Sequence, residues 1–181
     1  TYLGCILLDI GGGTTDIAAF FKETIRFSNV VPLGGANITS DIRSGLSTTP
    51  KYAEKLKTTL GDIFPEEIPE EDLLEVEGIG GRSEQPTKRK YLVTIIESRM
   101  REILEIAYKT LISTNYQDFM SAGIILTGGT SLLTNISHLA QSVFNMSSRI
   151  GYPNLERLEG NIGSLHDPRY STVVGLLYYA M

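Results

Sequence analysis

The residues best suited to chemistry lie in one short stretch near the start of the chain, from Asp9 to Asp16. An aspartate precedes three glycines, two threonines and a second aspartate. Glycines permit positive φ angles and leave backbone N–H groups uncovered, and successive N–H groups in a turn form a concavity that binds phosphate. A carboxylate beside such a turn suits Mg²⁺, which prefers oxygen ligands and keeps several waters. The stretch predicts a phosphate site with a metal at Asp9, and the alternative is a hairpin that simply needs glycine.

Two common phosphate-binding loops do not fit this stretch. The lysine of the G-x-x-x-x-G-K-[ST] loop is missing. The glycines also lack the G-x-G-x-x-G spacing and lead into the apolar run 17–21 instead of a helix, which excludes a Rossmann dinucleotide site. Apolar runs at 2–8 and 17–21 indicate two strands joined by the glycine turn.

Two further glycine pairs could bring a ligand close to the backbone. Gly128 and Gly129 follow an apolar strand at 122–126 and precede a helix expected at about 135–144. Glycines let a ligand pack on the backbone, and a helix start offers free N–H groups. The pair at 34–35 precedes another expected helix, and here a ligand site and a plain strand-to-helix turn are equally compatible with the sequence.

The elements around these corners predict an α/β architecture. The best helix is 91–115, whose apolar residues keep the i, i+3, i+4 pattern. The other expected elements are a strand at 24–33, a helix at 48–60 that Gly61 ends, a strand at 148–150 and a helix at 169–179. The segment 62–86 is acidic and is followed by three basic residues, which indicates short strands and loops at an exposed edge.

Composition narrows the class of protein. The chain has 181 residues, enough for one domain or one lobe, and a net charge of −5, which argues against a nucleic-acid-binding surface. The single cysteine, Cys5, favours a reducing compartment and excludes a disulfide framework. His138 and His166 lack metal-ligand spacing. No run is long enough to span a membrane. A start at Thr1, inside a strand-like run, suggests a piece of a larger protein.

Taken together, the motifs resemble the FtsA family of bacterial cell-division proteins, which are actin homologues. The matching stretches run in order along nearly the whole chain: LLDIGGGTTDIA, VVPLGGANITSDI, GIGGR, IIESRMREIL, GIILTGGTSLL, FNMSSRIGYP and DPRYSTVVGLLYYA. Ser98 stands where the family often shows proline. The resemblance implies an α/β fold of the actin/Hsp70-like (ribonuclease H-like) ATPase class, with a mixed sheet, flanking helices and an inserted α+β subdomain.

The resemblance also implies a domain plan. Residues 1–35 and 120–165 should form subdomain IIA, residues 36–119 the inserted subdomain IIB, and residues 166–181 a helix that returns toward a first lobe outside this chain. The family's C-terminal membrane helix also lies outside it. The full-length protein is therefore expected in the cytoplasm, at the inner face of the cell membrane at the division site.

ATP with Mg²⁺ is the cofactor that the resemblance implies. Asp9 should hold Mg²⁺ through water. The residues expected to face the phosphates are Gly11, Gly12, Gly13, Thr14 and Thr15. Those expected to pack on the adenosine are Thr127, Gly128, Gly129 and Thr130. Gly35 and Asn37 should lie near the ribose, and Glu97 and Arg101 are candidates for the base edge. No catalytic residue can be named, so at most a weak ATPase of the full-length protein is expected.

The family's partners follow in the same way. Subdomain IIB is expected to receive the C-terminal tail of the tubulin-like protein FtsZ, with Arg82, Lys90 and Arg99 as basic contacts. Self-association into actin-like filaments and contacts with other divisome proteins are also implied. The alternatives are an MreB-like filament protein, an Hsp70-like chaperone or a small-molecule kinase. A kinase would need a base or water-positioning residue beside the metal, and none is evident.

Overall fold

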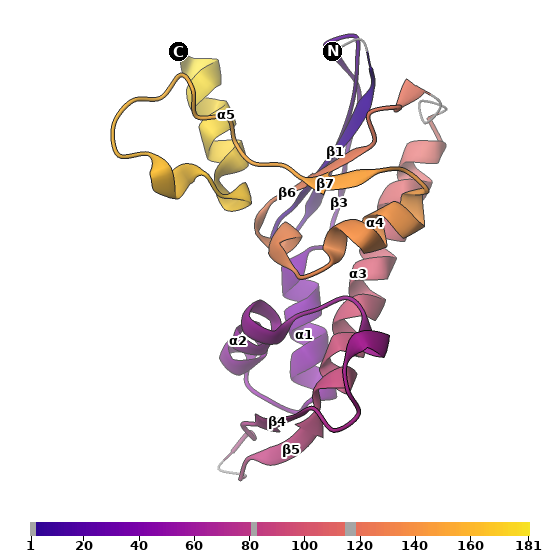
Figure 1. Cartoon of the computed structure of the whole chain (residues 1–181), viewed down its shortest axis with the longest axis vertical. Helices are drawn as coiled ribbons and strands as arrows, with labels where there is room; N and C mark the ends of the chain where they lie inside the picture. The colour runs from indigo at the N-terminus through magenta and orange to yellow at the C-terminus, as the bar shows by residue number, and fades with distance from the viewer. Residues whose placement is uncertain (1–2, 81–82, 115–118) are drawn as a thin grey trace.

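The protein has a sheet-containing part and a smaller, mainly helical part, and one long helix runs alongside both (Figure 1). This computed structural model describes residues 3–80, 83–114 and 119–181. The C-terminal residues lie toward the end of the molecule that carries the sheet (Figure 1).

Five strands form a mixed sheet in the order β3-β2-β1-β6-β7. β1 (Cys5–Ile10), β2 (Thr15–Phe21) and β3 (Thr24–Val31) are antiparallel neighbours. β6 (Ile124–Thr127) and β7 (Ser148–Ile150) extend the sheet parallel to β1. The glycine turn after β1 and the glycine corner after β6 therefore leave the sheet side by side, because parallel neighbouring strands end at the same edge.

Helices cover one face of this sheet. α3 (Arg89–Ile112) and α4 (Ile136–Phe144) pack on it. Every second strand residue is buried there, namely Ile6, Leu8, Ile10, Ile17 and Ala19. The helices contribute Met100, Ile103, Leu104, Leu139 and Phe144 to the same core. Successive side chains of a strand point to opposite faces, so Asp9 and Asp16, which pair across β1 and β2, share the other face.

The smaller part is built on the first half of α3. α1 (Gly35–Gly45) and α2 (Pro50–Leu60) pack together, and α1 also packs on α3. β4 (Leu73–Val76) and β5 (Gln85–Lys88) form a two-stranded antiparallel sheet at the far end (Figure 1). The core of this part includes Ile38, Ile42, Leu56, Leu92 and Ile96. α3 runs unbroken through Ser98.

The chain ends in a 3-10 turn, η5 (Pro168–Tyr170), and helix α5 (Ser171–Ala180). The last helix leans on the preceding loop, where the Tyr178 hydroxyl donates to the Asn154 carbonyl at 2.6 Å. Several of its apolar side chains are exposed: Val173, Leu176, Leu177 and Tyr179. Within the described ranges, no helix has the length and apolar character that crossing a membrane requires.

The mixed sheet with flanking helices confirms the predicted fold class, and the differences lie at element ends. The first strand occupies Cys5–Ile10 instead of 2–8. A 3-10 turn, η3 (Gly129–Leu132), separates β6 from α4, so no helix begins directly at the glycine corner. The last helix starts at Ser171, because Asp167 and Pro168 first form η5. The predicted subdomain boundaries at 35, 119 and 165 stay a prediction.

Candidate functional site

Three glycine-containing corners, far apart in sequence, are joined by hydrogen bonds at one edge of the sheet. The carbonyls of Gly11 and Gly12 accept hydrogen bonds from the N–H groups of Gly35 (2.9 Å) and Ala36 (2.8 Å). The Thr130 hydroxyl also donates to the Gly11 carbonyl, at 3.0 Å. The turn after β1, the start of α1 and the corner after β6 therefore form one rigid unit.

Glycine is required where these corners touch. Gly128 has φ +83°, and a Cβ there would lie 2.4 Å from the Asp9 Oδ1 atom and 2.6 Å from the Ile10 carbonyl oxygen. A Cβ on Gly34 would lie 2.7 Å from two carbonyl oxygens of the first turn. Positive φ with ψ near 165° is a conformation that only glycine adopts without strain. The close approach of the corners therefore depends on the missing side chains.

The first turn keeps hydrogen-bond donors free on its solvent side. The Gly11 N–H closes the turn by donating to the Thr14 carbonyl at 2.9 Å. Gly12 and Gly13 are exposed, and their N–H groups have no acceptor among the residues that the structure describes. Exposed successive N–H groups in a turn can bind an anion such as phosphate.

Two carboxylates lie beside this turn on the same face of the sheet. Asp9 is half-buried, and its Oδ2 atom accepts a hydrogen bond from the Thr172 hydroxyl at 2.7 Å. Asp16 is exposed, and its Oδ2 atom accepts from the Thr14 hydroxyl at 3.2 Å. The described residues contain no group of three or more side chains that could hold a metal. Two carboxylates fit Mg²⁺, which keeps most of its waters, better than a cation that needs a full protein cage.

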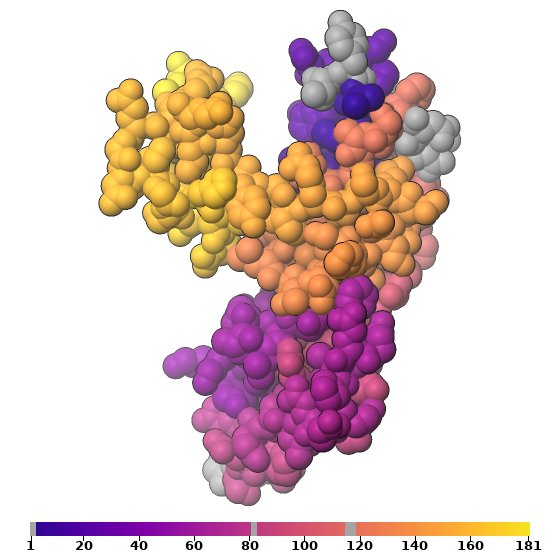
Figure 2. Space-filling model, viewed as in Figure 1, coloured from indigo at the N-terminus to yellow at the C-terminus, as the bar shows by residue number. Residues whose placement is uncertain are grey.

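A pocket of about 470 Å³ opens beside the joined corners. The surface is hollowed between the C-terminal segment and α2 (Figure 2). The corners contribute Gly12, Gly129 and Thr130 to its lining. The other lining residues are Glu54, Lys57, Thr58, Thr59, Gly61, Leu132, Leu133, Thr134 and Arg169. Its volume is in the range of small-molecule sites, a few hundred cubic ångströms, so a nucleoside would fit.

Lys57 of α2 is the central charged group of this pocket. It is only 8% exposed, and its Nζ atom donates to the Gly35 carbonyl (3.0 Å) and the Thr39 hydroxyl oxygen (2.9 Å). It also forms an ion pair with Glu54 at 2.7 Å. Burial alone would raise the pKa of Glu54, but the hydrogen bonds from Lys57 and Thr39 and the Lys57 charge together lower it. Lys57 therefore ties α2 to the start of α1 and keeps a cation beside the pocket.

The position of Lys57 and Glu54 at the pocket was not predicted from the sequence. The apolar stripe of the helix is formed by Ala53, Leu56 and Leu60, and Lys57 lies at a position of the same stripe. A lysine at a buried helical position is rare unless it is paired, and Glu54 precedes it by three residues. A lysine on the apolar stripe with a glutamate three residues before it is the feature of the sequence that indicates a buried ion pair on α2.

Some predicted ligand residues form hydrogen bonds within the chain. The Thr15 side chain is fully buried, and its hydroxyl donates to the Leu33 carbonyl at 2.9 Å. The Thr127 hydroxyl lies 2.6 Å from the Ser171 hydroxyl. The Asn37 Oδ1 atom accepts from the Gly34 N–H at 2.9 Å and caps α1. The first N–H groups of α1 are already bonded, so this helix start does not offer the free donors that a ligand would need.

The residues predicted for the base edge are not brought to the pocket. Glu97 and Arg101 form an ion pair with each other along α3, at 2.6 Å, and neither is among the lining residues. An ion pair between residues four apart on a helix is an ordinary surface feature. The assignment of a nucleotide base to these two side chains gains no support from their positions.

The basic residues predicted for a partner protein are paired within the chain. Lys90 forms an ion pair with Glu70 at 2.5 Å. The Nε and Nη2 atoms of Arg99 donate to the two carboxylate oxygens of Asp41, at 2.5 and 3.1 Å. Those hydrogen bonds raise the pKa of Arg99. Arg82 lies outside the described residues.

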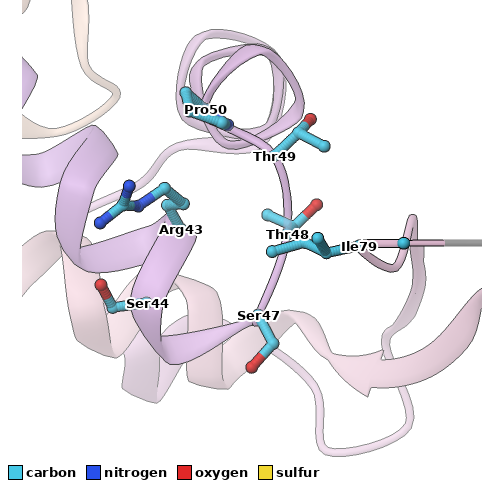
Figure 3. A pocket seen from close by; sticks show the side chains of 8 residues that line it. Arg43, Ser44, Ser47, Thr48, Thr49, Pro50 and Ile79 are labelled. Atoms are coloured by element: carbon cyan, nitrogen blue, oxygen red, sulfur yellow. The ribbon is translucent and has the colours of Figure 1, made fainter. Parts of the chain in front are cut away.

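A larger pocket, of about 720 Å³, lies at the other end of α1 (Figure 3). Among the residues that the structure describes, Arg43 is the charged residue that lines this pocket, and the joined glycine corners do not line it. The remaining lining residues are Ser44, Ser47, Thr48, Thr49, Pro50, Ile79 and Gly80. Volume alone therefore does not identify the functional site, because Gly12 of the phosphate-compatible turn and Gly129 and Thr130 of the corner after β6 line the smaller pocket.

The chain is similar in sequence to known proteins. The chain is 40% identical over 178 residues to the cell division protein FtsA of Bacillus subtilis, and 36% identical over 179 residues to that of Pseudomonas aeruginosa. These matches cover 98% and 99% of this chain but only 39% and 42% of the relatives, so the chain spans about two-fifths of their length.

A solved structure shows the same fold. MreB5 of Spiroplasma citri, crystallised with ADP, superimposes with a TM-score of 0.73 at 20% sequence identity, covering 98% of this chain and 53% of that one. The fold is thus that of the actin-like proteins. Residues 6–175 match the profile of the family described as cell division protein FtsA. This chain therefore belongs to the FtsA family of cell division proteins.

Proposed function

We propose that this chain is the part of an actin-like cell-division protein that binds ATP with Mg²⁺ at the joined glycine corners. The observation that carries the proposal is the convergence of free turn N–H groups, a carboxylate pair and a pocket on three segments distant in sequence. ADP in the similarly folded MreB5 supports a nucleotide as the ligand. We propose that ATP is bound by a full-length protein that contains this chain and has the length of the relatives.

Each side chain would have a distinct task. The N–H groups of Gly12 and Gly13 would receive phosphate oxygens, and Asp9 would hold the metal through water, with Asp16 on the same face as a second carboxylate. Bound Mg²⁺ would neutralise charge on the phosphates. Gly129 and Thr130, at the pocket wall, would contact the nucleoside together with Glu54 and Lys57 of α2.

Replacing Lys57 with methionine tests the pocket directly. In a full-length FtsA protein carrying this chain, titration calorimetry should show binding of Mg-ATP by the wild type. The Lys57→Met variant should bind at least about tenfold more weakly, because the hydrogen bonds from Lys57 to Gly35 and Thr39 that hold α2 at the pocket wall are lost, and a charge-assisted hydrogen bond contributes about 1.5 to 3 kcal/mol. The melting temperature should also fall, because Glu54 loses its ion-pair partner and the Gly35 carbonyl loses a donor.

Lys55 offers the matched control. It lies on the same helix but is exposed and does not line the pocket. Lys55→Met should leave ATP binding unchanged. Absence of Mg-ATP binding in the wild type would refute the proposed function, and equal affinities of the wild type and Lys57→Met would remove α2 from the site.

We also propose that the groove between α1 and α3 receives an acidic segment of a partner, the C-terminal tail of FtsZ. This groove has a volume of about 350 Å³ and contains Arg99 beside Ile95 and Thr94. The Arg99 guanidinium lies there next to an apolar side chain, and the Asp41 carboxylate that pairs with it also lines the groove, so an acidic residue of the tail would displace Asp41. Lys90 does not line this groove, and its charge is matched by Glu70.

Removing the positive or the negative charge of the Arg99–Asp41 ion pair tests whether the tail binds in this groove. Arg99→Met should weaken binding of a fluorescent FtsZ-tail peptide about tenfold, because a charge-assisted contact is lost. Asp41→Asn should strengthen it, because the competing carboxylate of the guanidinium is neutralised. Anisotropy titration measures both. If both variants change the affinity for the tail in the same direction, or if neither changes it, the tail binds elsewhere. Unchanged ATP binding in both variants would show that the fold is intact.

Attachment at the division site, recruitment of other divisome proteins and assembly into filaments complete the proposal. They rest on membership of the family, and the matched relatives are more than twice as long as this chain.

A further inference from the structure

Arg169 lies at the edge of the pocket in a position that the proposed nucleotide contacts leave unexplained. It belongs to η5, far from the glycine corners in sequence, yet it lines the same pocket as Gly129 and Thr130. The η5 segment is fixed to β6 by the Gly128 N–H, which donates to the Pro168 carbonyl at 3.2 Å. Arg169 is therefore carried by backbone that is anchored to the site.

The side chain of Arg169 crosses Gly129. A Cβ added to Gly129 would meet the Arg169 Cγ atom at 3.5 Å, an ordinary contact distance. The stem of Arg169 thus lies against the backbone of the corner, and the residue lines the pocket.

Asp167 fixes the orientation of the guanidinium. Its Oδ1 atom accepts from the Arg169 Nε atom (3.0 Å) and backbone N–H (2.9 Å), and its Oδ2 atom accepts from Nη2 (2.8 Å). Hydrogen bonds from the side chain and backbone of Arg169 lower the pKa of Asp167, so the pair stays ionised at neutral pH. A two-point contact along one edge of the guanidinium leaves both of its flat faces available.

The neighbouring pocket wall is apolar. Leu132 and Leu133 of the segment after β6 line it, and the Leu132 side chain is 48% exposed. The Arg169 side chain is 60% exposed. A flat aromatic ring would cover both groups. Guanidinium groups stack on aromatic faces, and such stacking tolerates different bases because every base has a π-face.

We propose that Arg169, oriented by Asp167, stacks on the base of the bound nucleotide and supplies base-dependent affinity without reading the base edge. This inference rests on the proposed function, because it requires a nucleotide in the pocket. It assigns the base to η5 and Leu132, in contrast to the sequence-based candidates Glu97 and Arg101.

The test compares ligands with and without a base. Mg-ATP and magnesium tripolyphosphate are titrated by calorimetry into a full-length FtsA protein carrying this chain. Arg169→Lys keeps the charge but loses the planar group, so it should weaken ATP binding about tenfold, as expected for loss of one stacking contact. Arg169→Tyr keeps a flat ring and should retain most of the affinity. Tripolyphosphate binding should be the same in all three proteins.

Arg149→Ala is the matched control, because Arg149 is an exposed arginine on β7 that does not line the pocket, and it should bind both ligands normally. If the Arg169 variants lose tripolyphosphate and ATP affinity equally, the side chain acts as a phosphate cation and the inference is overturned. Unchanged ATP binding in Arg169→Lys overturns it as well, while the proposed function stands. A wild type that binds neither ligand overturns both.

Discussion

Gly128→Ala is expected to destabilise the protein strongly, because it adds a methyl group where two segments touch. The new Cβ would lie 2.4 Å from the Asp9 carboxylate and 2.6 Å from the Ile10 carbonyl oxygen, and backbone cannot move aside as a flexible side chain can. The residue would also keep a glycine-only conformation, with φ +83°. Strain and overpacking each cost about 1 to 3 kcal/mol, roughly 2 to 6 kcal/mol together.

Thermal unfolding measures this effect. A loss of that size lowers the melting temperature of a chain of this length by roughly 5 to 20 °C. Gly163→Ala is the control, because a Cβ there would meet nothing within 4 Å and its φ lies outside the positive region. It should melt within about 2 °C of the wild type. If Gly128→Ala has the same melting temperature as the wild type, the corner after β6 is not packed tightly against β1.

Asp9→Asn is expected to abolish the dependence of ATP binding on magnesium. Asparagine has the shape of aspartate and can still accept the hydrogen bond from Thr172, but it lacks the charge that holds a hydrated cation. Removing a group that contacts a metal's outer shell typically costs 10- to 100-fold in metal affinity. The wild type should bind ATP 10- to 100-fold more tightly with Mg²⁺ than with EDTA, whereas the variant should bind equally in both, as measured by calorimetry.

Two further variants sharpen this prediction. Glu66→Gln removes the same charge from an exposed residue of the 3-10 turn η1 (Pro65–Glu67) and should leave the magnesium effect intact. Asp16→Asn should reduce it partly, because Asp16 shares the face of the sheet but lacks the contact with α5. If the Asp9→Asn variant still binds ATP about 10- to 100-fold more tightly with Mg²⁺ than with EDTA, Asp9 does not hold the metal, and another carboxylate does.

The sequence determined the local structure of the site. The Asp-x-Gly-Gly-Gly-Thr-Thr-Asp stretch predicted a strand–turn–strand unit, and β1 and β2 confirm it. Glycine turns and hydrophobic periodicity are local signals, so they can be detected without knowledge of the fold. The family resemblance, carried by motifs in order along the chain, was also confirmed.

Only the tertiary structure decided which residues share the pocket. Pairing of β1 with β6 brings Gly128 into contact with Asp9. Lys57 is buried against the start of α1, so α2, which looks like a surface helix in the sequence, lines the pocket. Thr15 belongs to the turn motif but points into the core, because side chains alternate along β2. Sequence spacing fixes which way neighbouring side chains point, whereas long-range packing fixes which segments meet. Arg169 and Glu54 could therefore not be joined to the glycine corners before the fold was known.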